Sequence, residues 1–448
     1  MSLAVANISE ILDGREIGAF QKRVIALCAA IAFVDGIEGQ LAGYIAPALR
    51  ADWGLSAPEL GVFLASGPLG LLVGGLFIAP LADRFGRRPI LLACVTLFGI
   101  CSLLTAMSGS LFTLNGFRFL TGLGVGGALA NSISLTAEYS PTHRRSLMVA
   151  VMLLGFIVGS LAVGLLSAQI VPLLGWRSVL IAGGALSLLL VPFLYFALPE
   201  SIRFLAVREG TRDEVVRLMR RVDPTLAIDH TTRLTVGEHR EPSVSVAALF
   251  RDGRARTTIL LWTVYFMSLL TLYLMSSWVT THVHSLGVGV SVAILIGTLF
   301  QLGGIFGTVS GWMADRIGPG ITILITYATG AVAIACIGFA GSNLTALGIA
   351  VFVAGVGIIG GQSATNALAA ISYPTQIRST GVGWATGIGR IGSIIGPSLA
   401  GILVGIYGST QSIFFLAVIP PLCACAAGVV LSSLKPPPTI GAKGDAHA

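Results

Sequence analysis

Two acidic residues, Asp35 and Glu38, lie inside an apolar stretch near the start of the chain. Their spacing of three places both carboxyl groups on one side of a helix. An ionised carboxylate at the centre of a lipid bilayer costs about 2.5–3.5 kcal/mol, and two neighbouring anions repel each other. The pair is therefore suited to binding and releasing a proton. The alternative is that one acid pairs with an arginine and holds two helices together.

Two arginines, Arg118 and Arg390, are the basic residues that fall inside apolar stretches. A guanidinium stays charged and can hold a carboxylate through two hydrogen bonds, so both are candidates for binding an anionic substrate. Arg390 falls in the middle of its stretch, whereas Arg118 falls early in its own. The alternative for either arginine is a structural role, as the partner of Asp35, of Glu38 or of a backbone carbonyl.

These charges suggest a way to couple a proton to an anion. In the empty state an arginine pairs with one of the two acids and keeps it ionised. A substrate carboxylate then competes for that arginine, and the acid that loses its partner takes up a proton. Proton and anion would cross together without leaving an uncompensated charge in hydrocarbon.

Four further side chains are candidate substrate contacts. Gln362 and Asn366 are four residues apart and share one face of a predicted helix. Their amides could hydrogen-bond a substrate hydroxyl or carboxylate, or join neighbouring helices. Tyr265 and Trp384 could stack on a flat ring, although aromatic side chains in membrane helices commonly face lipid or the interfaces.

Long apolar segments carry all of these residues. Of the 448 residues, 54% are hydrophobic and 10% are charged, against roughly 25% charged in an ordinary soluble domain. This balance excludes a disordered chain and a soluble enzyme, and it predicts a polytopic membrane protein. The spans must be helices, because hydrocarbon cannot satisfy open strand edges. A span needs about 20 residues, and twelve segments qualify: 24–48, 59–80, 90–109, 112–137, 146–170, 177–198, 257–281, 290–313, 320–340, 344–370, 379–406 and 410–432.

Most of the 27 Lys and Arg residues lie in alternate links between these segments, which predicts that both termini face the cytoplasm. The net charge of +7 is spread over the links, so we expect no nucleic-acid binding. One link is long and polar, and it divides the chain. We expect an N-terminal six-helix bundle over 1–198, a cytoplasmic linker over 199–256, and a C-terminal six-helix bundle with a short tail over 257–448.

The two halves repeat a charged motif. Residues 83–86 (Asp-Arg-Phe-Gly) correspond to residues 315–318 (Asp-Arg-Ile-Gly), each after the second span of its half. Duplicated halves are typical of transporters that hold their substrate near the middle of the membrane. We interpret the charged links as a cytoplasmic gate, although such links also enforce topology. The residues assigned to the gate are Asp83, Arg84, Gly86, Arg87, Arg88, Glu138, Arg145, Asp315 and Arg316.

The chain resembles the major facilitator superfamily over nearly its whole length. Residues 83–88 (Asp-Arg-Phe-Gly-Arg-Arg) are similar to the signature loop between helices 2 and 3 of that superfamily. The second copy of this loop has Pro319 where the first copy has Arg87. Residues 118–124 (Arg-x-x-x-Gly-x-Gly) are similar to the helix-4 motif of the superfamily.

Within that superfamily, the chain resembles the aromatic acid:proton symporters. Residues 35–38 (Asp-Gly-Ile-Glu) are similar to the Asp-Gly-x-Asp motif of that family, and Glu38 adds one methylene to the second acid. The resemblance implies twelve transmembrane helices in two pseudo-symmetric six-helix bundles. It also implies proton-coupled uptake of small aromatic carboxylates, such as benzoate or hydroxybenzoate, across the cytoplasmic (inner) membrane.

We expect a monomer that is not an enzyme, with no metal and no cofactor, and with the proton as coupling ion. Two other transport functions stay open. One is a proton-coupled antiporter that exports drugs or metabolites, and the other is a symporter similar to the sugar porters. A receptor that transports nothing is a third alternative, against which the lack of a sizeable soluble domain argues.

Overall fold

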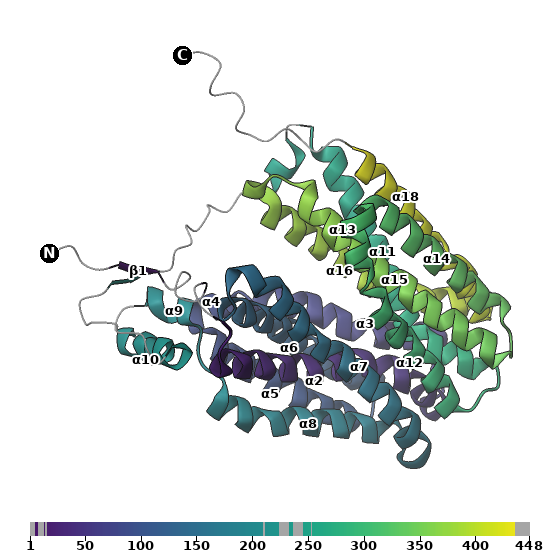
Figure 1. Cartoon of the computed structure of the whole chain (residues 1–448). Coiled ribbons are helices and arrows are strands. Elements are labelled where there is room, and N and C mark those ends of the chain that lie inside the picture. Colours follow the sequence, from purple (N-terminus) through teal and green to yellow (C-terminus); the bar gives the residue numbers. More distant parts are fainter. Residues whose placement is uncertain are drawn as a thin grey trace. The chain divides into compact units, whose positions relative to one another are not determined.

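The structure is a computed structural model that describes residues 5–7, 13, 16–208, 211–223, 233–235, 245–251 and 253–434. Within these ranges, 12 helical segments are long and apolar enough to cross a membrane (Figure 1). Each of them overlaps one predicted span. The predicted all-helical membrane fold is therefore confirmed.

The spans of the first half are α2 (Ala19–Trp53), α3 (Ala57–Val73) with α4 (Leu81–Phe85), α5 (Arg87–Ala106), α6 (Leu111–Glu138), α7 (Arg145–Leu174) and α8 (Trp176–Ala197). Those of the second half are α11 (Ala255–Ser285), α12 (Val290–Gly307) with α13 (Ser310–Ile317), α14 (Pro319–Phe339), α15 (Leu344–Ser372), α16 (Thr375–Tyr407), and α17 (Gln411–Leu416) with α18 (Ile419–Ser433).

The sequence repeat is also a structural repeat. The second span of each half ends in a short helix, α4 or α13, which stops at a glycine. Gly86 has a φ of 99° and Gly318 has a φ of 89°. Glycine adopts such positive φ values at little cost, because it has no Cβ. The chain therefore turns sharply at both positions and enters the next span, α5 or α14.

Short elements connect the two halves. They are α9 (Ile202–Val207), α10 (Arg212–Val222), a 3-10 turn (Val246–Phe250), and strand β2 (Arg233–Thr235), which pairs in parallel with β1 (Val5–Asn7). The charged helix α10 buries Val215, Leu218 and Met219. Since Leu218 and Met219 follow Val215 by three and four positions, the three residues form one apolar face.

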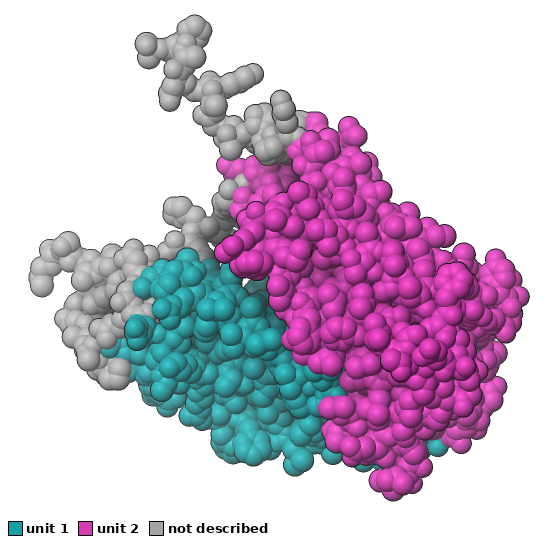
Figure 2. All heavy atoms as spheres, turned by 45° about the vertical axis from the view of Figure 1, so that its right-hand side comes forward, with its two compact units in different colours: residues 1–41, 69–163, 177–240 teal, residues 42–68, 164–176, 241–448 magenta. Residues whose placement is uncertain are grey.

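The molecule comprises two compact units (Figure 2). Unit 1 contains residues 1–41, 69–163 and 177–240, and unit 2 contains residues 42–68, 164–176 and 241–448. Helices α2, α3 and α7 therefore contribute residues to both units. The predicted bundle boundaries at residues 198 and 257 stay a prediction.

Glycines let the helices of unit 1 pack backbone against backbone. A methyl group at Gly36 of α2 would lie 2.1 Å from the carbonyl oxygen of Phe156 in α7, and one at Gly159 of α7 would lie 2.0 Å from that of Phe33. Neither position admits a side chain. Close approach of this kind is the usual role of small residues in membrane helices, and here it fixes the rotation of α2, which carries the two predicted proton-binding acids.

Unit 2 uses the same device. Gly392 and Gly396 of α16 lie against the carbonyl oxygens of Phe266 and Leu270 in α11, where a methyl group would come within 2.3 and 2.5 Å. Helix α15 packs between α12 and α14. These contacts fix the orientation of α16, which carries Arg390, and of α15, which carries the amide pair.

Candidate functional site

The acid pair of α2 is wholly buried in unit 1. Asp35 and Glu38 expose 0% and 1% of their surface. A methyl group at Gly183 of α8 would lie 2.9 Å from the Oε1 atom of Glu38, so this carboxylate packs directly against α8. Both acids thus project into the helix bundle and away from lipid, as a proton-binding role requires.

Glu38 has a basic partner. Arg118 of α6 places Nη1 3.4 Å from the Oε2 atom of Glu38, and its Nη2 donates a hydrogen bond of 3.0 Å to the main-chain oxygen of the same residue. Arg118 is itself 3% exposed. Of the two roles considered for Arg118, the structure therefore shows the ion pair, and a substrate could not reach this guanidinium in the observed conformation.

Asp35 has no such partner. Neither of its carboxylate oxygens accepts a hydrogen bond from any residue in the described part of the chain. An isolated ionised carboxylate is very costly to bury, whereas the neutral acid avoids most of that cost. Of the two acids, Asp35 is therefore the one whose charge the described residues leave uncompensated.

Arg390 of α16 lies in a different setting, in unit 2. It is half-buried, and its Nη1 atom is 3.5 Å from the hydroxyl oxygen of Tyr273 in α11. Among the described residues, no carboxylate lies within ion-pair distance of Arg390. Its guanidinium can therefore bind a carboxylate from outside the chain, whereas the guanidinium of Arg118 is already paired with Glu38.

The two predicted amides belong to a polar cluster that joins α11, α14 and α15. The hydroxyl of Tyr265 donates to the Oδ1 atom of Asn366 over 2.8 Å, and that of Ser268 donates to the Oε1 atom of Gln362 over 2.7 Å. The Nε2 atom of Gln362 is 3.4 Å from the same oxygen of Asn366. Tyr327 of α14 joins the cluster, because its hydroxyl donates a hydrogen bond of 2.7 Å to Ser268.

Sequence reasoning missed Ser268 and Tyr327. Hydroxyl groups in a buried membrane helix need a hydrogen-bond partner, and this requirement was the available signal. The structure also changes the role expected of Tyr265. Its side chain is 2% exposed, so its ring is not available to stack on a substrate, and its hydroxyl serves the amide of Asn366.

Trp384 lies in an aromatic group apart from this cluster. Its ring stacks on that of Trp262, with centroids 6.3 Å apart, and Trp262 meets Phe250 edge-on at 5.5 Å. Trp384 remains 45% exposed. Its exposed face could stack on a ring, but no contact joins Trp384 to Arg390 or to the amides in the described residues.

The predicted gate residues of the first half are brought together at the start of α5. Arg87 pairs with Asp83 at 2.8 Å and with Glu138 at 3.3 Å. Arg88 donates to the main-chain oxygen of Tyr195, while the guanidinium of Arg84 stays exposed and lies 5.5 Å from a ring centroid. All of these residues belong to unit 1. The contacts therefore brace the ends of the helices within one unit.

Glu200 is a member of this network to which sequence reasoning assigned no role. Its Oε1 atom accepts hydrogen bonds from the main-chain N–H groups of Arg87 at 2.7 Å and Arg88 at 3.2 Å. N–H groups at a helix N-terminus have no acceptor within the helix, and a carboxylate is favoured there. Tyr139 donates from its hydroxyl to the main-chain oxygen of Glu200 over 2.6 Å. Burial raises the pKa of Tyr139 well above its usual value, so this hydroxyl remains a donor.

Among the described residues, the second copy of the motif forms no such network. Asp315 and Arg316 are exposed, and the guanidinium of Arg316 lies 4.6 Å from the ring centroid of Trp312. Pro319 is the first residue of α14. Since proline has no N–H group, this helix needs no acceptor there. Arg145, the remaining predicted gate residue, is the first residue of α7 and is half-buried. The gating role of all these residues stays a prediction.

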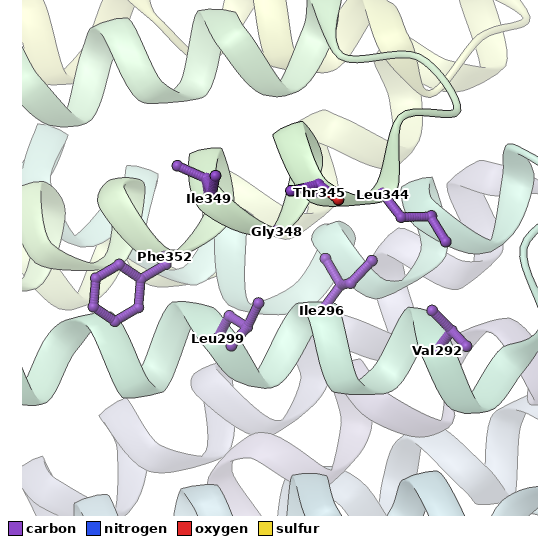
Figure 3. Close-up of a pocket in the computed structure, with 8 residues that line it drawn as sticks. All are labelled: Val292, Ile296, Leu299, Leu344, Thr345, Gly348, Ile349 and Phe352. Carbon is purple, nitrogen blue, oxygen red and sulfur yellow. The ribbon is translucent and has the colours of Figure 1, made fainter.

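A cavity of about 460 Å³ lies between α12 and α15 (Figure 3). It is lined by apolar side chains and one hydroxyl, those of Val292, Ile296, Leu299, Leu344, Thr345, Ile349 and Phe352, together with Gly348. Figure 3 shows the side chains of Ile296 and Leu299 on one helix facing the segment that carries Ile349 and Phe352. None of the predicted site residues lines this cavity, and its lining offers no charge to an anion.

The chain belongs to the Major Facilitator Superfamily, whose model it matches over residues 28–370 and 261–447. It is therefore a multi-pass membrane transporter and not an enzyme. It is 38% identical over 430 residues to the 4-hydroxybenzoate transporter PcaK of Pseudomonas aeruginosa, covering 96% of each chain. It is also 38% identical to the gallate transporter of Pseudomonas putida, covering 95% of this chain and 94% of that one.

The fold is shared with solved transporters. A bacterial homologue of the human lysosomal transporter Spinster, in an inward-facing and occupied conformation, superposes with a TM-score of 0.74 over 93% of this chain and 98% of the other. The two sequences are 17% identical. This likeness establishes the fold and nothing further.

Proposed function

We propose that this transporter carries small aromatic carboxylates into the cell together with protons. The observation that carries the proposal is that two ionisable side chains lack a partner among the described residues. The buried Asp35 has no hydrogen-bond partner, and the half-buried Arg390 has no carboxylate partner. The first needs a proton and the second needs an anion. A symporter of organic acids supplies both.

The substrate class is supported by relatives and by chemistry. The two relatives above are named for 4-hydroxybenzoate and gallate, which are both hydroxylated benzoic acids. Arg390 supplies the planar donor pair that a carboxylate prefers. The neighbouring hydroxyl of Tyr273 and the amides of Gln362 and Asn366 supply further polar contacts within the same unit.

The proton site is assigned to Asp35, with Glu38 in a supporting role. Because Arg118 already pairs with Glu38, the coupling scheme needs one change: the substrate carboxylate binds Arg390, which has no carboxylate partner among the described residues, and it displaces neither acid from an arginine. Protonation of Asp35 removes a charge from the apolar interior, and the carboxylate is balanced by Arg390. The loaded transporter then carries no unpaired charge at these positions, which lowers the cost of its conformational change.

The proposal places the protein in the cytoplasmic (inner) membrane with both termini in the cytoplasm, as a monomer that uses the proton as coupling ion and needs no cofactor. A proton-coupled exporter is the main alternative. The direction of net flux along an imposed pH gradient separates the two functions.

Uptake into proteoliposomes tests the proposal. Purified wild-type protein should accumulate labelled 4-hydroxybenzoate when the outside is made acidic. Asp35→Asn should lose this accumulation but retain exchange of internal for external substrate, because exchange needs no net proton movement. Glu59→Gln is the matched control, since Glu59 is an exposed acid at the start of α3. Full accumulation by Asp35→Asn would reject Asp35 as the coupling site, and no uptake by the wild type would reject the function.

A further inference from the structure

A buried chain of hydroxyl groups leads to the two amides of unit 2. Tyr327 is fully buried. Its hydroxyl lies 2.9 Å from that of Thr365 and donates to Ser268 over 2.7 Å. Since Ser268 accepts this bond, its own proton is free to go to the Oε1 atom of Gln362, 2.7 Å away. The chain of hydrogen bonds therefore has a direction, and it ends on an amide oxygen.

Both amide oxygens are occupied by donors from the protein. The Oε1 atom of Gln362 accepts from Ser268, and the Oδ1 atom of Asn366 accepts from Tyr265 and from the Nε2 atom of Gln362. The N–H groups that remain are those of the Asn366 amide and one of Gln362. Asn366 is exposed and Gln362 is half-buried. These N–H groups have no hydrogen-bond partner among the described residues, and they are therefore available to donate to an oxygen of the substrate.

Tyr265 contacts both the helix that carries Arg390 and the amide of Asn366. Gly389, the residue before Arg390, lies against this tyrosine, where a methyl group would come within 3.2 Å of its Cβ atom. The hydroxyl of the same tyrosine donates to Asn366. A carboxylate held by Arg390 and an oxygen held by the amides would thus be bound by helices that contact one another in unit 2.

We infer that Gln362 and Asn366 recognise an oxygen substituent on the ring of the substrate, and that Tyr327 and Ser268 are positioning residues that hold the amides in their donor orientation. This inference deepens the proposed function and rests on it. A phenolic oxygen accepts hydrogen bonds from the amides, whereas a ring C–H leaves their N–H groups unpaired. The transporter should therefore prefer hydroxylated benzoates to benzoate itself.

The ratio of kcat/KM for 4-hydroxybenzoate to that for benzoate measures this preference in proteoliposomes. Loss of one hydrogen bond is expected to lower the ratio about tenfold. The change should come from a lower kcat/KM for 4-hydroxybenzoate, while kcat/KM for benzoate should change little. Asn366→Ala removes the donor itself. Tyr327→Phe and Ser268→Ala remove the hydrogen bonds that orient the amides, and both should also lower the ratio. If one of these variants fails to fold, the other still tests the inference.

Tyr373→Phe is the matched control. Tyr373 is a buried tyrosine of the same unit whose hydroxyl donates to Thr258 over 3.1 Å, outside the cluster. Its loss should leave the ratio unchanged, which separates recognition from a general loss of stability. An unchanged ratio in folded Asn366→Ala and Tyr327→Phe would overturn the inference, as would a wild-type ratio of one. Transport of neither acid by the wild type would overturn the proposed function as well.

Discussion

Arg118 contacts Glu38 at two points, the carboxylate oxygen at 3.4 Å and the main-chain oxygen at 3.0 Å, although the two residues are 80 positions apart in the chain. The double contact fixes one turn of α2 against α6. It also separates the two acids of α2 by role, because Asp35, one turn away, receives no donor from the described residues. One helix face thus carries a paired acid and an unpaired one.

Replacing one residue of the Arg118–Glu38 pair should destabilise the protein more than replacing both residues. Glu38→Leu leaves a buried guanidinium without its counter-charge, and Arg118→Leu leaves a buried carboxylate without its own, each at a cost of about 3–5 kcal/mol. The double variant Glu38→Leu/Arg118→Leu removes both charges and should recover much of that loss. Thermal unfolding in detergent measures the three melting temperatures. Additive effects of the single changes would show that the pair is not coupled.

Arg390 should control the affinity for the substrate carboxylate. Arg390→Gln removes a charge-assisted contact, and we expect KM for 4-hydroxybenzoate to rise about ten- to hundredfold. Arg390→Lys keeps the charge but loses the planar donor pair, so its KM should lie in between. Arg256→Gln, which removes an exposed arginine of the same unit away from the site, is the control and should change KM little. Equal KM values in all four proteins would favour a substrate without a carboxylate.

Alanine at the two repeated glycines should have unequal effects. Gly86→Ala and Gly318→Ala both force a side chain into a backbone region that is essentially restricted to glycine, at a cost of about 1–3 kcal/mol. A methyl group at Gly86 would also lie 2.3 Å from the Oε2 atom of Glu200, whereas nothing lies within 4 Å at Gly318. Gly86→Ala should therefore lower the melting temperature further. Equal shifts would mean that the contact with Glu200 contributes nothing to stability.

The sequence by itself determined the number and course of the spans. Apolar runs of sufficient length must be helices in hydrocarbon, and each of the twelve lies where the sequence predicts it. The ends differ by a few residues, as in α2, which begins at Ala19 and ends at Trp53 where the apolar run predicts 24–48. It also placed Asp35 with Glu38, and Gln362 with Asn366, because spacings of three and four define one helix face. These are local properties, which neighbouring residues along the chain decide.

The tertiary structure decided which partner each polar side chain has. Arg118 could pair with either acid, and only the packing of α6 on α2 selects Glu38. Tyr265 is a candidate for stacking by its type, but the fold buries its ring and directs its hydroxyl to Asn366. Tyr327 meets Ser268 across 59 positions, and Glu200 meets Arg87 across 113. Such pairings depend on how helices rotate against one another, which hydropathy and spacing within one segment do not specify.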